Sequence, residues 1–209
     1  MARWTSNLCL ACSVLSIVML AGCRSLVPFG PSERWDAGAV PYQFEYAGAE
    51  QTTISLVGAR WRLIFKEFAD AEDAAAERRA IARSIGLCEQ AAGEQTPAWQ
   101  DEPRSNATPC MKGQLDCIAE SENTTTFLLL FREHGLLRFH DVLRPVYRSQ
   151  AFVFDPHRTA LIRDRASGRV YAVDSWVGKN GDEALVQEYG PWRRKEGPSR
   201  TPPKEKRSR

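Results

Sequence analysis

The first 22 residues of this sequence have the composition of a segment that is removed from the mature protein. They carry one charged side chain, Arg3, and no acid, and an uncharged run extends from Leu8 to Leu20. This run is too short for the roughly 20 apolar residues that span a bilayer, and it has the length of the apolar part of an export signal. The alternative, a buried hydrophobic helix that begins at Leu8, lacks an amphipathic pattern and a cap. We therefore expect residues 1–22 to be a signal peptide.

The apolar run ends in the tetrapeptide Leu20-Ala21-Gly22-Cys23. This tetrapeptide resembles the lipobox of bacterial lipoproteins at all four positions. The resemblance implies cleavage before Cys23 and a palmitate-bearing lipid anchor on that cysteine. By the family's sorting rule, Arg24 in place of an aspartate favours the outer membrane. We therefore expect a protein tethered to the bacterial envelope that faces the periplasm or the exterior.

Charge is distributed unevenly along the 209 residues. The sequence has 28 Lys+Arg and 26 Asp+Glu, but the tail from Arg193 to Arg209 alone holds eight basic and two acidic side chains. Residues 23–192 keep 19 basic and 24 acidic side chains, a net charge of −5. A mildly acidic body disfavours nucleic acid as a partner. The tail cannot bury a core, so we expect it to be disordered, either as a solubilising extension or as a contact with anionic lipid or envelope polymer.

About 170 residues between the signal and the tail suffice for one domain with a hydrophobic core. Residues 23–41 are rich in proline and glycine and are predicted to be a linker from the lipid anchor. Residues 42–192 are predicted to form a single domain, and residues 193–209 the disordered basic tail. Helical patterns precede strand patterns along this domain, which predicts an α+β fold.

The expected elements follow from apolar periodicity and from turn residues. In chain order they are an ordered segment over 42–46, a strand over 53–57, a helix start at 59, a helix over 68–90, a surface loop over 91–113, a helix from 117 to a C-terminal turn at 134–135, and strands over 136–142, 146–154, 159–162 and 169–176. In the helix that begins at Cys117, Asp116 is a suitable N-cap. Asn123 and Thr124 in this helix are expected to line a polar groove, to face solvent or to mark an irregular helix start.

Three of the six cysteines are expected in the mature domain. Two lie in the signal peptide and one takes the lipid, which leaves Cys88, Cys110 and Cys117. The simplest scheme pairs Cys88 with Cys110 across a loop and stabilises the fold by about 3 kcal/mol. Cys117 is then a free thiol in an oxidising compartment. In the alternative scheme Cys117 itself forms the disulfide, with Cys110 or with Cys88.

Cys117 is the candidate for chemistry. The partial positive charge at a helix N-terminus stabilises a thiolate, and a nucleophilic thiolate needs a base that is oriented by an acceptor. His157 stands at the start of a predicted strand and Asp174 near the end of the next. A hairpin centred between Arg165 and Ala166 places these two side chains opposite each other, about 5 Å apart.

The order of these motifs resembles the transglutaminase-like, papain-fold cysteine peptidases of bacteria, over roughly residues 110–180. The stretches that carry the resemblance are Asp116-Cys117-Ile118-Ala119-Glu120, His157-Arg158-Thr159-Ala160-Leu161-Ile162 and Val170-Tyr171-Ala172-Val173-Asp174-Ser175-Trp176. It implies a papain-like or transglutaminase-like domain with N-terminal helices packed on a C-terminal antiparallel sheet. It further implies that Cys117 is the nucleophile, His157 the general base and then acid, and Asp174 the group that sets the imidazole tautomer.

The implied reaction is acyl transfer at an amide bond, by peptide hydrolysis or by exchange with an amine. An envelope protein or a peptidoglycan peptide would be the substrate. For an oxyanion, the backbone N–H of Cys117 is the expected donor, with the side chain of Gln114 as a second. The sequence has no metal-ligand spacing, phosphate-binding loop or nucleotide fingerprint, so no metal and no cofactor is expected.

Each candidate also has a structural interpretation. His134 is suited to a helix C-terminus and His140 to a partly buried strand position. Asp174 could instead cap the turn before Gly178. The competing hypothesis is a non-catalytic envelope lipoprotein that uses the same scaffold to bind a protein or peptidoglycan partner.

Overall fold

The computed structural model describes residues 36–196 except 107, 109–110 and 151–152. The predicted signal peptide, the lipobox and most of the basic tail therefore lie outside the described residues. The elements in chain order are β1 (Val40–Phe44), η1 (Tyr46–Gly48), β2 (Glu50–Ile54), α1 (Ala59–Ala69), α2 (Ala74–Gln95), η2 (Pro97–Gln100), α3 (Cys117–Glu133), β3 (His140–Gln150), β4 (Val153–Asp164), β5 (Val170–Asp174), β6 (Leu185–Glu188) and α4 (Tyr189–Arg193).

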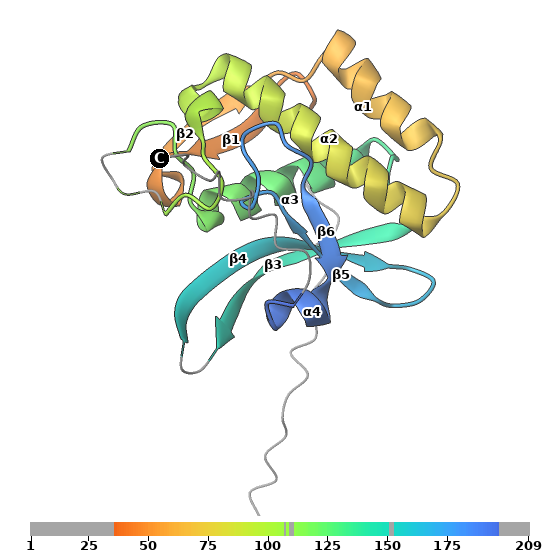
Figure 1. The fold of residues 1–209 in the computed structure, drawn as a ribbon. Helices are drawn as coiled ribbons and strands as arrows, with labels where there is room; N and C mark the ends of the chain where they lie inside the picture. Colours follow the sequence, from red (N-terminus) through yellow and green to blue (C-terminus); the bar gives the residue numbers. More distant parts are fainter. Residues whose placement is uncertain (1–35, 107, 109–110, 151–152, 197–209) are drawn as a thin grey trace, which may run out of the picture.

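Two layers make up the fold. One is an antiparallel sheet of four strands in the order β3-β4-β5-β6, and the other holds α1, α2 and α3 on one face of that sheet (Figure 1). A separate two-stranded hairpin, β1-β2, packs against α3. The expectation of an α+β domain, with N-terminal helices on an antiparallel sheet, is confirmed. The short α4 follows β6 and lies against β5 and β6.

Helix α3 lies between the sheet and the other helices and supplies much of the core. Its C-terminal half contributes a block of fully or almost fully buried apolar side chains: Phe127, Leu128, Leu129, Leu130 and Phe131. Its N-terminal half is rich in Ser, Asn and Thr, which favour helices poorly. There, Thr125 donates its hydroxyl proton to the carbonyl of Ser121 at 2.6 Å, so this buried polar group is satisfied within the helix.

The prediction of one helix over 68–90 is wrong in its bounds. Phe68 belongs to α1, where it joins Ile64 one turn earlier on the buried face. The chain breaks after Ala69, and the Asp73 carboxylate accepts a hydrogen bond from Ala76 N at 2.6 Å as the N-cap of α2. Helix α2 then continues to Gln95, because its small side chains allow close packing in the core. The expected loop over 91–113 therefore begins later and contains η2.

Strand bounds also differ from the prediction. The expected strands over 136–142 and 146–154 correspond to one long strand, β3, and to the beginning of β4. The Cα register shifts between Leu143 and Val146, which marks an irregularity opposite Thr159 and Leu161. Pro145, which cannot donate a ladder hydrogen bond, lies within this irregularity of β3. Strand β6 and helix α4 were not predicted.

The β4–β5 hairpin has a register shifted from the predicted one. The pairs Ala160–Val173 and Arg163–Val170 place its centre between Ala166 and Ser167, one residue later than expected. In this register Asp174 is displaced by two residues from the position opposite His157. A displacement of two keeps both side chains on one face of the sheet, because the side-chain period of a strand is two.

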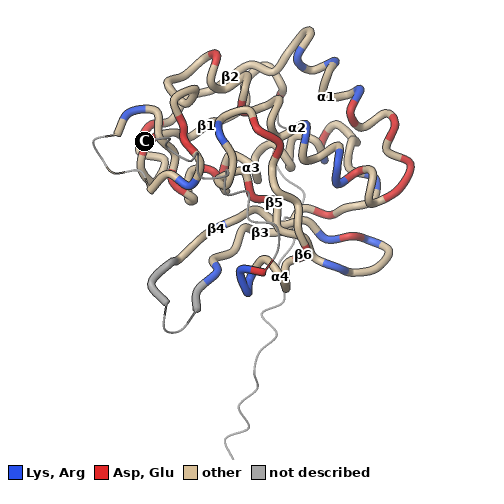
Figure 2. Tube along the Cα trace, viewed as in Figure 1, with Lys and Arg blue, Asp and Glu red and all other residues tan. Residues whose placement is uncertain are grey.

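Charges of both signs are interspersed along the described trace, with several arginines around the β4–β5 turn (Figure 2). Within residues 36–196 as described, no helix is long and apolar enough to cross a membrane.

Candidate active site

The N-terminus of α3 is held by the carboxylate of Asp116. Its Oδ1 accepts hydrogen bonds from the N–H groups of Ile118 and Ala119, both at 3.0 Å, and its Oδ2 accepts from Ala47 N at 2.9 Å. The predicted cap is therefore confirmed, and it also ties η1 to α3. The backbone N–H of Cys117 belongs to the first turn of α3, where N–H groups have no carbonyl partner within the helix.

Cys117 is the first residue of α3, and its side chain is partly exposed and carries no disulfide. The predicted helix start at this cysteine is therefore confirmed. A thiol at this position is accessible to a reagent while it is exposed to the positive end of the helix dipole.

His157 is almost fully buried, with 1% of its surface exposed, on β4. Its strand partner is Arg148 of β3, and it lies beyond the last residue of β4 that pairs with β5. The Nε2 atom of His157 lies 2.7 Å from Oδ2 of Asp174. The predicted contact between these two residues is present.

Asp174 is the last residue of β5 and is held from the other side by its pairing with Leu185 of β6. It is 3% exposed. Its Oδ2 accepts two hydrogen bonds, one involving Nε2 of His157 at 2.7 Å and one from Nε1 of Trp192 at 2.8 Å. Both partners are side chains of the triad region, so the carboxylate does not take the alternative role of capping the turn before Gly178.

Two tryptophans flank the imidazole of His157. The Trp176 ring centroid lies 4.5 Å from it, at an interplanar angle of 34°, and the Trp192 centroid lies at 5.6 Å. Trp176 is itself anchored, because its Nε1 donates to Ser105 O at 2.8 Å and its carbonyl accepts from Arg104 N at 2.7 Å. The ring packing shields the hydrogen bond between His157 and Asp174 from water.

The remaining ring nitrogen of His157, Nδ1, is buried and has no hydrogen-bond partner within the described part of the chain. The pKa of His157 is nevertheless raised to about 9. Burial lowers this pKa, but the hydrogen bond with Asp174, the interaction with Cys117 and the negative charge of both partners outweigh the burial. Cys117 thus lies close enough to bias the charge of the imidazole. The structure brings Cys117, His157 and Asp174 together.

The side chain of Gln114 is engaged with the preceding loop. Its Nε2 donates to Gln100 O at 2.5 Å, and its Oε1 accepts from Glu102 N at 3.2 Å. Gly113 lies against Pro97 so closely that a Cβ at this position would collide with the proline carbonyl. These contacts fix the segment that leads into Cys117. Oxyanion donation by Gln114 stays a prediction.

Asn123 and Thr124 are buried and bonded within the protein. The Asn123 amide bonds with the backbone of Gln43, accepting from its N–H at 2.8 Å and donating to its carbonyl at 2.6 Å. The Thr124 hydroxyl lies 2.9 Å from that of Ser175. None of the three predicted explanations, a groove, solvent exposure or an irregular helix start, is observed. Both residues are buried within the continuous helix α3, and their side chains connect it to β1 and to the residue that follows β5.

A cluster of three buried carboxyl groups lies behind the triad: Glu89 from α2, Asp101 after η2 and Glu120 from α3. Ser175 donates its hydroxyl proton to Glu120 Oε2 at 2.5 Å, and Leu115 N donates to Asp101 Oδ1 at 2.7 Å. Because Glu120 lies one turn after Cys117 and Ser175 follows Asp174, the cluster connects both parts of the site.

The carboxyl groups of this cluster hold protons at unusually high pH. Burial, followed by the negative charge of Glu120, raises the pKa of Glu89 well above its ordinary value and that of Asp101 to about 8. Burial also raises the pKa of Glu120. Three acids in contact in a dry site cannot all ionise, so protons are shared among them near neutral pH.

The two other histidines lie outside the triad. His134 follows α3 as its C-cap, as expected, with its ring 4.8 Å from that of Trp61. His140 begins β3 and is fully buried rather than partly buried, with Nδ1 2.8 Å from Oε1 of Glu77. That pair joins the start of α2 to the sheet.

The cysteines among the described residues, Cys88 and Cys117, form no disulfide. Cys88 is a buried free thiol, and Cys110 lies outside the described residues. Over the described stretches, no group of three or more His, Cys, Asp or Glu side chains is arranged to hold a metal ion.

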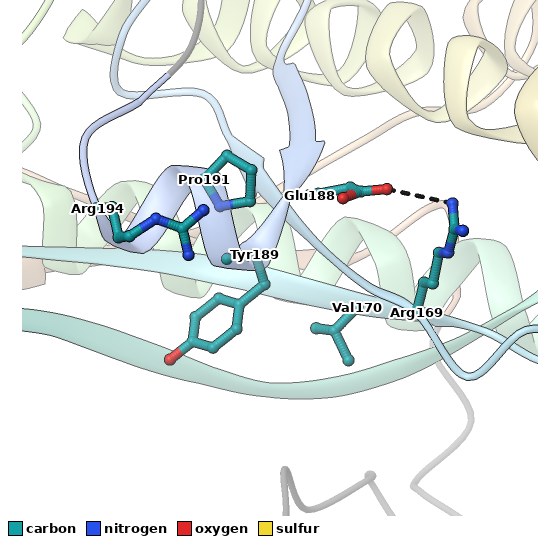
Figure 3. A pocket seen from close by; sticks show the side chains of 7 residues that line it. Arg169, Val170, Glu188, Tyr189, Pro191 and Arg194 are labelled. Carbon is teal, nitrogen blue, oxygen red and sulfur yellow. Dashed lines mark hydrogen bonds and ion pairs between the residues drawn. The ribbon is translucent and has the colours of Figure 1, made fainter.

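A separate surface pocket of about 530 Å³ lies beside α4, lined by Arg169, Val170, Glu188, Tyr189, Gly190, Pro191 and Arg194 (Figure 3). Its two arginines are already paired, Arg169 with Glu188 at 3.4 Å and Arg194 with Glu196 at 2.8 Å. None of the triad residues lines this pocket.

Sequence reasoning did not find Trp192, Ser175 or the carboxyl cluster. A tryptophan in a short helix after an unpredicted strand carries no local signal. The acids of the cluster are indistinguishable in the sequence from the solvated acids around them. No family model, no curated protein and no solved structure matches this chain.

Proposed function

We propose that this protein is an envelope lipoprotein whose domain is papain-like or transglutaminase-like and catalyses acyl transfer at amide bonds. One observation supports the proposal: the imidazole of His157 is bonded to Asp174 through Nε2 and also interacts with Cys117, while its buried Nδ1 makes no well-formed hydrogen bond to any of the described residues. That arrangement leaves the base free to exchange a proton with the thiol or a substrate.

The first half of the reaction forms a thioester. The thiolate of Cys117 attacks the carbonyl carbon of the amide, and the backbone N–H of Cys117 donates to the oxyanion. The imidazolium of His157 then gives its proton to the amide nitrogen. The C–N bond breaks, the amine leaves, and the acyl group remains on sulfur.

The second half releases the acyl group. His157, now neutral, takes a proton from water or from an acceptor amine, whose oxygen or nitrogen attacks the thioester carbon. The C–S bond breaks and the thiolate of Cys117 is restored beside the imidazolium. Asp174 stabilises the imidazolium and holds the ring in one orientation throughout.

The environment of the site supports this chemistry. The raised pKa of His157 keeps it protonated at neutral pH, as a partner of a thiolate must be. The packing of Trp176 on the imidazole excludes water from one side of the ring.

The test is a comparison of wild type with Cys117→Ala on isolated envelope fractions that contain peptidoglycan and envelope proteins. Released peptides and amines, and new amide cross-links, are identified by mass spectrometry. We expect products from wild type and from the matched control Cys110→Ser, and none from Cys117→Ala. Identical product profiles for wild type and Cys117→Ala would support the non-catalytic alternative.

A further inference from the structure

Trp192 reaches the site from the last helix of the described chain. Its indole is 2% exposed, and its Nε1 donates to Oδ2 of Asp174 at 2.8 Å. The same oxygen lies 2.7 Å from Nε2 of His157. The ring of Trp192 also packs against that of His157, with centroids 5.6 Å apart. One side chain therefore contacts both the acceptor and the base.

The indole is held in place independently of Asp174. Arg148 of β3 donates from Nη1 to the carbonyl of Trp192 at 3.1 Å, and its guanidinium lies 4.8 Å from the centre of the indole ring. Tyr189, one turn earlier in α4, stacks on Trp192 with centroids 6.1 Å apart. Because α4 is fixed by these contacts, the indole N–H is a preorganised donor toward Asp174.

We propose that Trp192 is a positioning residue for the triad: its indole N–H fixes the Asp174 carboxylate, and through it the imidazole of His157, in the orientation that faces Cys117. A carboxylate with a single hydrogen-bond donor can rotate about its side-chain bonds and carry the imidazole with it. A second donor from a rigid element removes that freedom. The inference rests on the proposed function, because it assigns Trp192 a role in the same triad.

The charged and titratable neighbours of His157 determine how the reactivity of Cys117 depends on pH. Asp174 lies against Nε2, and Cys117 is close enough to raise the pKa of the ring. The charge of Asp174 in turn raises the pKa of Glu120, and the guanidinium of Arg148 lies 4.8 Å from the centre of the Trp192 ring. A change confined to the indole N–H leaves all four in place.

The experiment measures alkylation of Cys117 by iodoacetamide, which needs no substrate. Trp192→Phe keeps an aromatic ring and removes the donor, and the Cys117 peptide is quantified by mass spectrometry across a pH series. We expect alkylation near pH 6 to slow about tenfold, the loss that corresponds to one hydrogen bond to a charged group, with a smaller difference at alkaline pH. Trp61→Phe, the same change in α1, should match wild type.

Wild-type rate and pH dependence in a folded Trp192→Phe protein would overturn the proposal. An equal slowing of alkylation at every pH would also overturn the proposal, because that is the result expected from a general loss of packing. Folding of each variant is checked by circular dichroism and thermal unfolding.

A second measurement on the wild-type protein keeps the proposal testable if Trp192→Phe does not fold. After alkylation of Cys117, the indole N–H resonance of Trp192 should shift in a ¹⁵N spectrum, while that of Trp61 stays in place. No shift would overturn the proposal. The proposed function can fail separately: alkylation of Cys117 would then depend on Trp192, but the wild-type protein would turn over no envelope substrate.

Discussion

His157 and Asp174 meet at 2.7 Å although the two strands that carry them have stopped pairing with each other at that point. The last β4–β5 pair is Ala160 with Val173. His157 is supported instead by β3, through Arg148, and Asp174 by β6, through Leu185. The two outer strands of the sheet therefore hold the two polar members of the site in register.

Removing the charge of Asp174 should lower the pKa of His157. Burial lowers that pKa, but the hydrogen bonds and negative charges of Asp174 and Cys117, with Asp174 the larger contributor, raise it to about 9. In Asp174→Asn we expect the pKa to move toward the ordinary histidine value of about 6.5, because burial then dominates. An NMR titration of the His157 ring measures this shift. Asp141→Asn, a half-exposed carboxylate on β3, is the control; an unchanged His157 titration in Asp174→Asn would contradict the assignment.

The carboxyl cluster should make the fold sensitive to alkaline pH. A group whose pKa is higher in the folded than in the unfolded state stabilises the fold fully at low pH, and this contribution is lost as the pH rises through the folded pKa. Glu89 has such a raised pKa, and that of Asp101 is about 8. We therefore expect Glu89→Gln to gain stability relative to wild type as the pH rises from about 5 to about 9.

Chemical denaturation at several pH values measures this difference. The exposed Glu50→Gln on β2 should give a constant difference from wild type over the same range. A Glu89→Gln curve that runs parallel to the wild-type curve would show that Glu89 does not hold a proton in the fold.

Asn123→Ala should destabilise the domain by about 2 kcal/mol. The Asn123 amide makes two hydrogen bonds to the backbone of Gln43, and it is 2% exposed. Its removal leaves a partly buried strand N–H and carbonyl without partners. Urea unfolding measures the loss, and the exposed Asn106→Ala should change the free energy of unfolding by less than about 0.5 kcal/mol.

Cys23→Ser should release the protein from the membrane fraction. If the Leu20-Ala21-Gly22-Cys23 stretch acts as a lipobox, this variant loses its lipid anchor and its processing at that site. Cell fractionation and the intact mass of the mature protein check both outcomes. A wild-type mass without lipid, with an N-terminus other than Cys23, would contradict the prediction.

The start of α3 was predictable because its signals are local. Asp116 caps the helix, Cys117 begins it and Gly135 follows it with a positive φ of 70°. Each of these depends on a few neighbouring residues, and a capping carboxylate acts over less than one turn. The sequence therefore located the thiol within its helix correctly.

The pairing of His157 with Asp174 was predicted from a register that proved to be shifted. It survived because the shift moved Asp174 by two residues and kept it on the same face, where a long ring and a carboxylate reach each other diagonally. A shift of one residue would have turned the two side chains to opposite faces of the sheet.

The sequence alone was enough to determine the α+β class and the thiol at a helix start, since each depends on composition or on contacts between near neighbours. The export signal stays a prediction. The indole of Trp192 on Asp174 and the proton-sharing acids behind Cys117 were decided by the tertiary structure. Glu89 and Glu120 are brought together by two helices, and Trp192 by a strand whose pattern was too short to predict. Such contacts join residues far apart in the chain, and their energies depend on burial, which arises only when the layers pack.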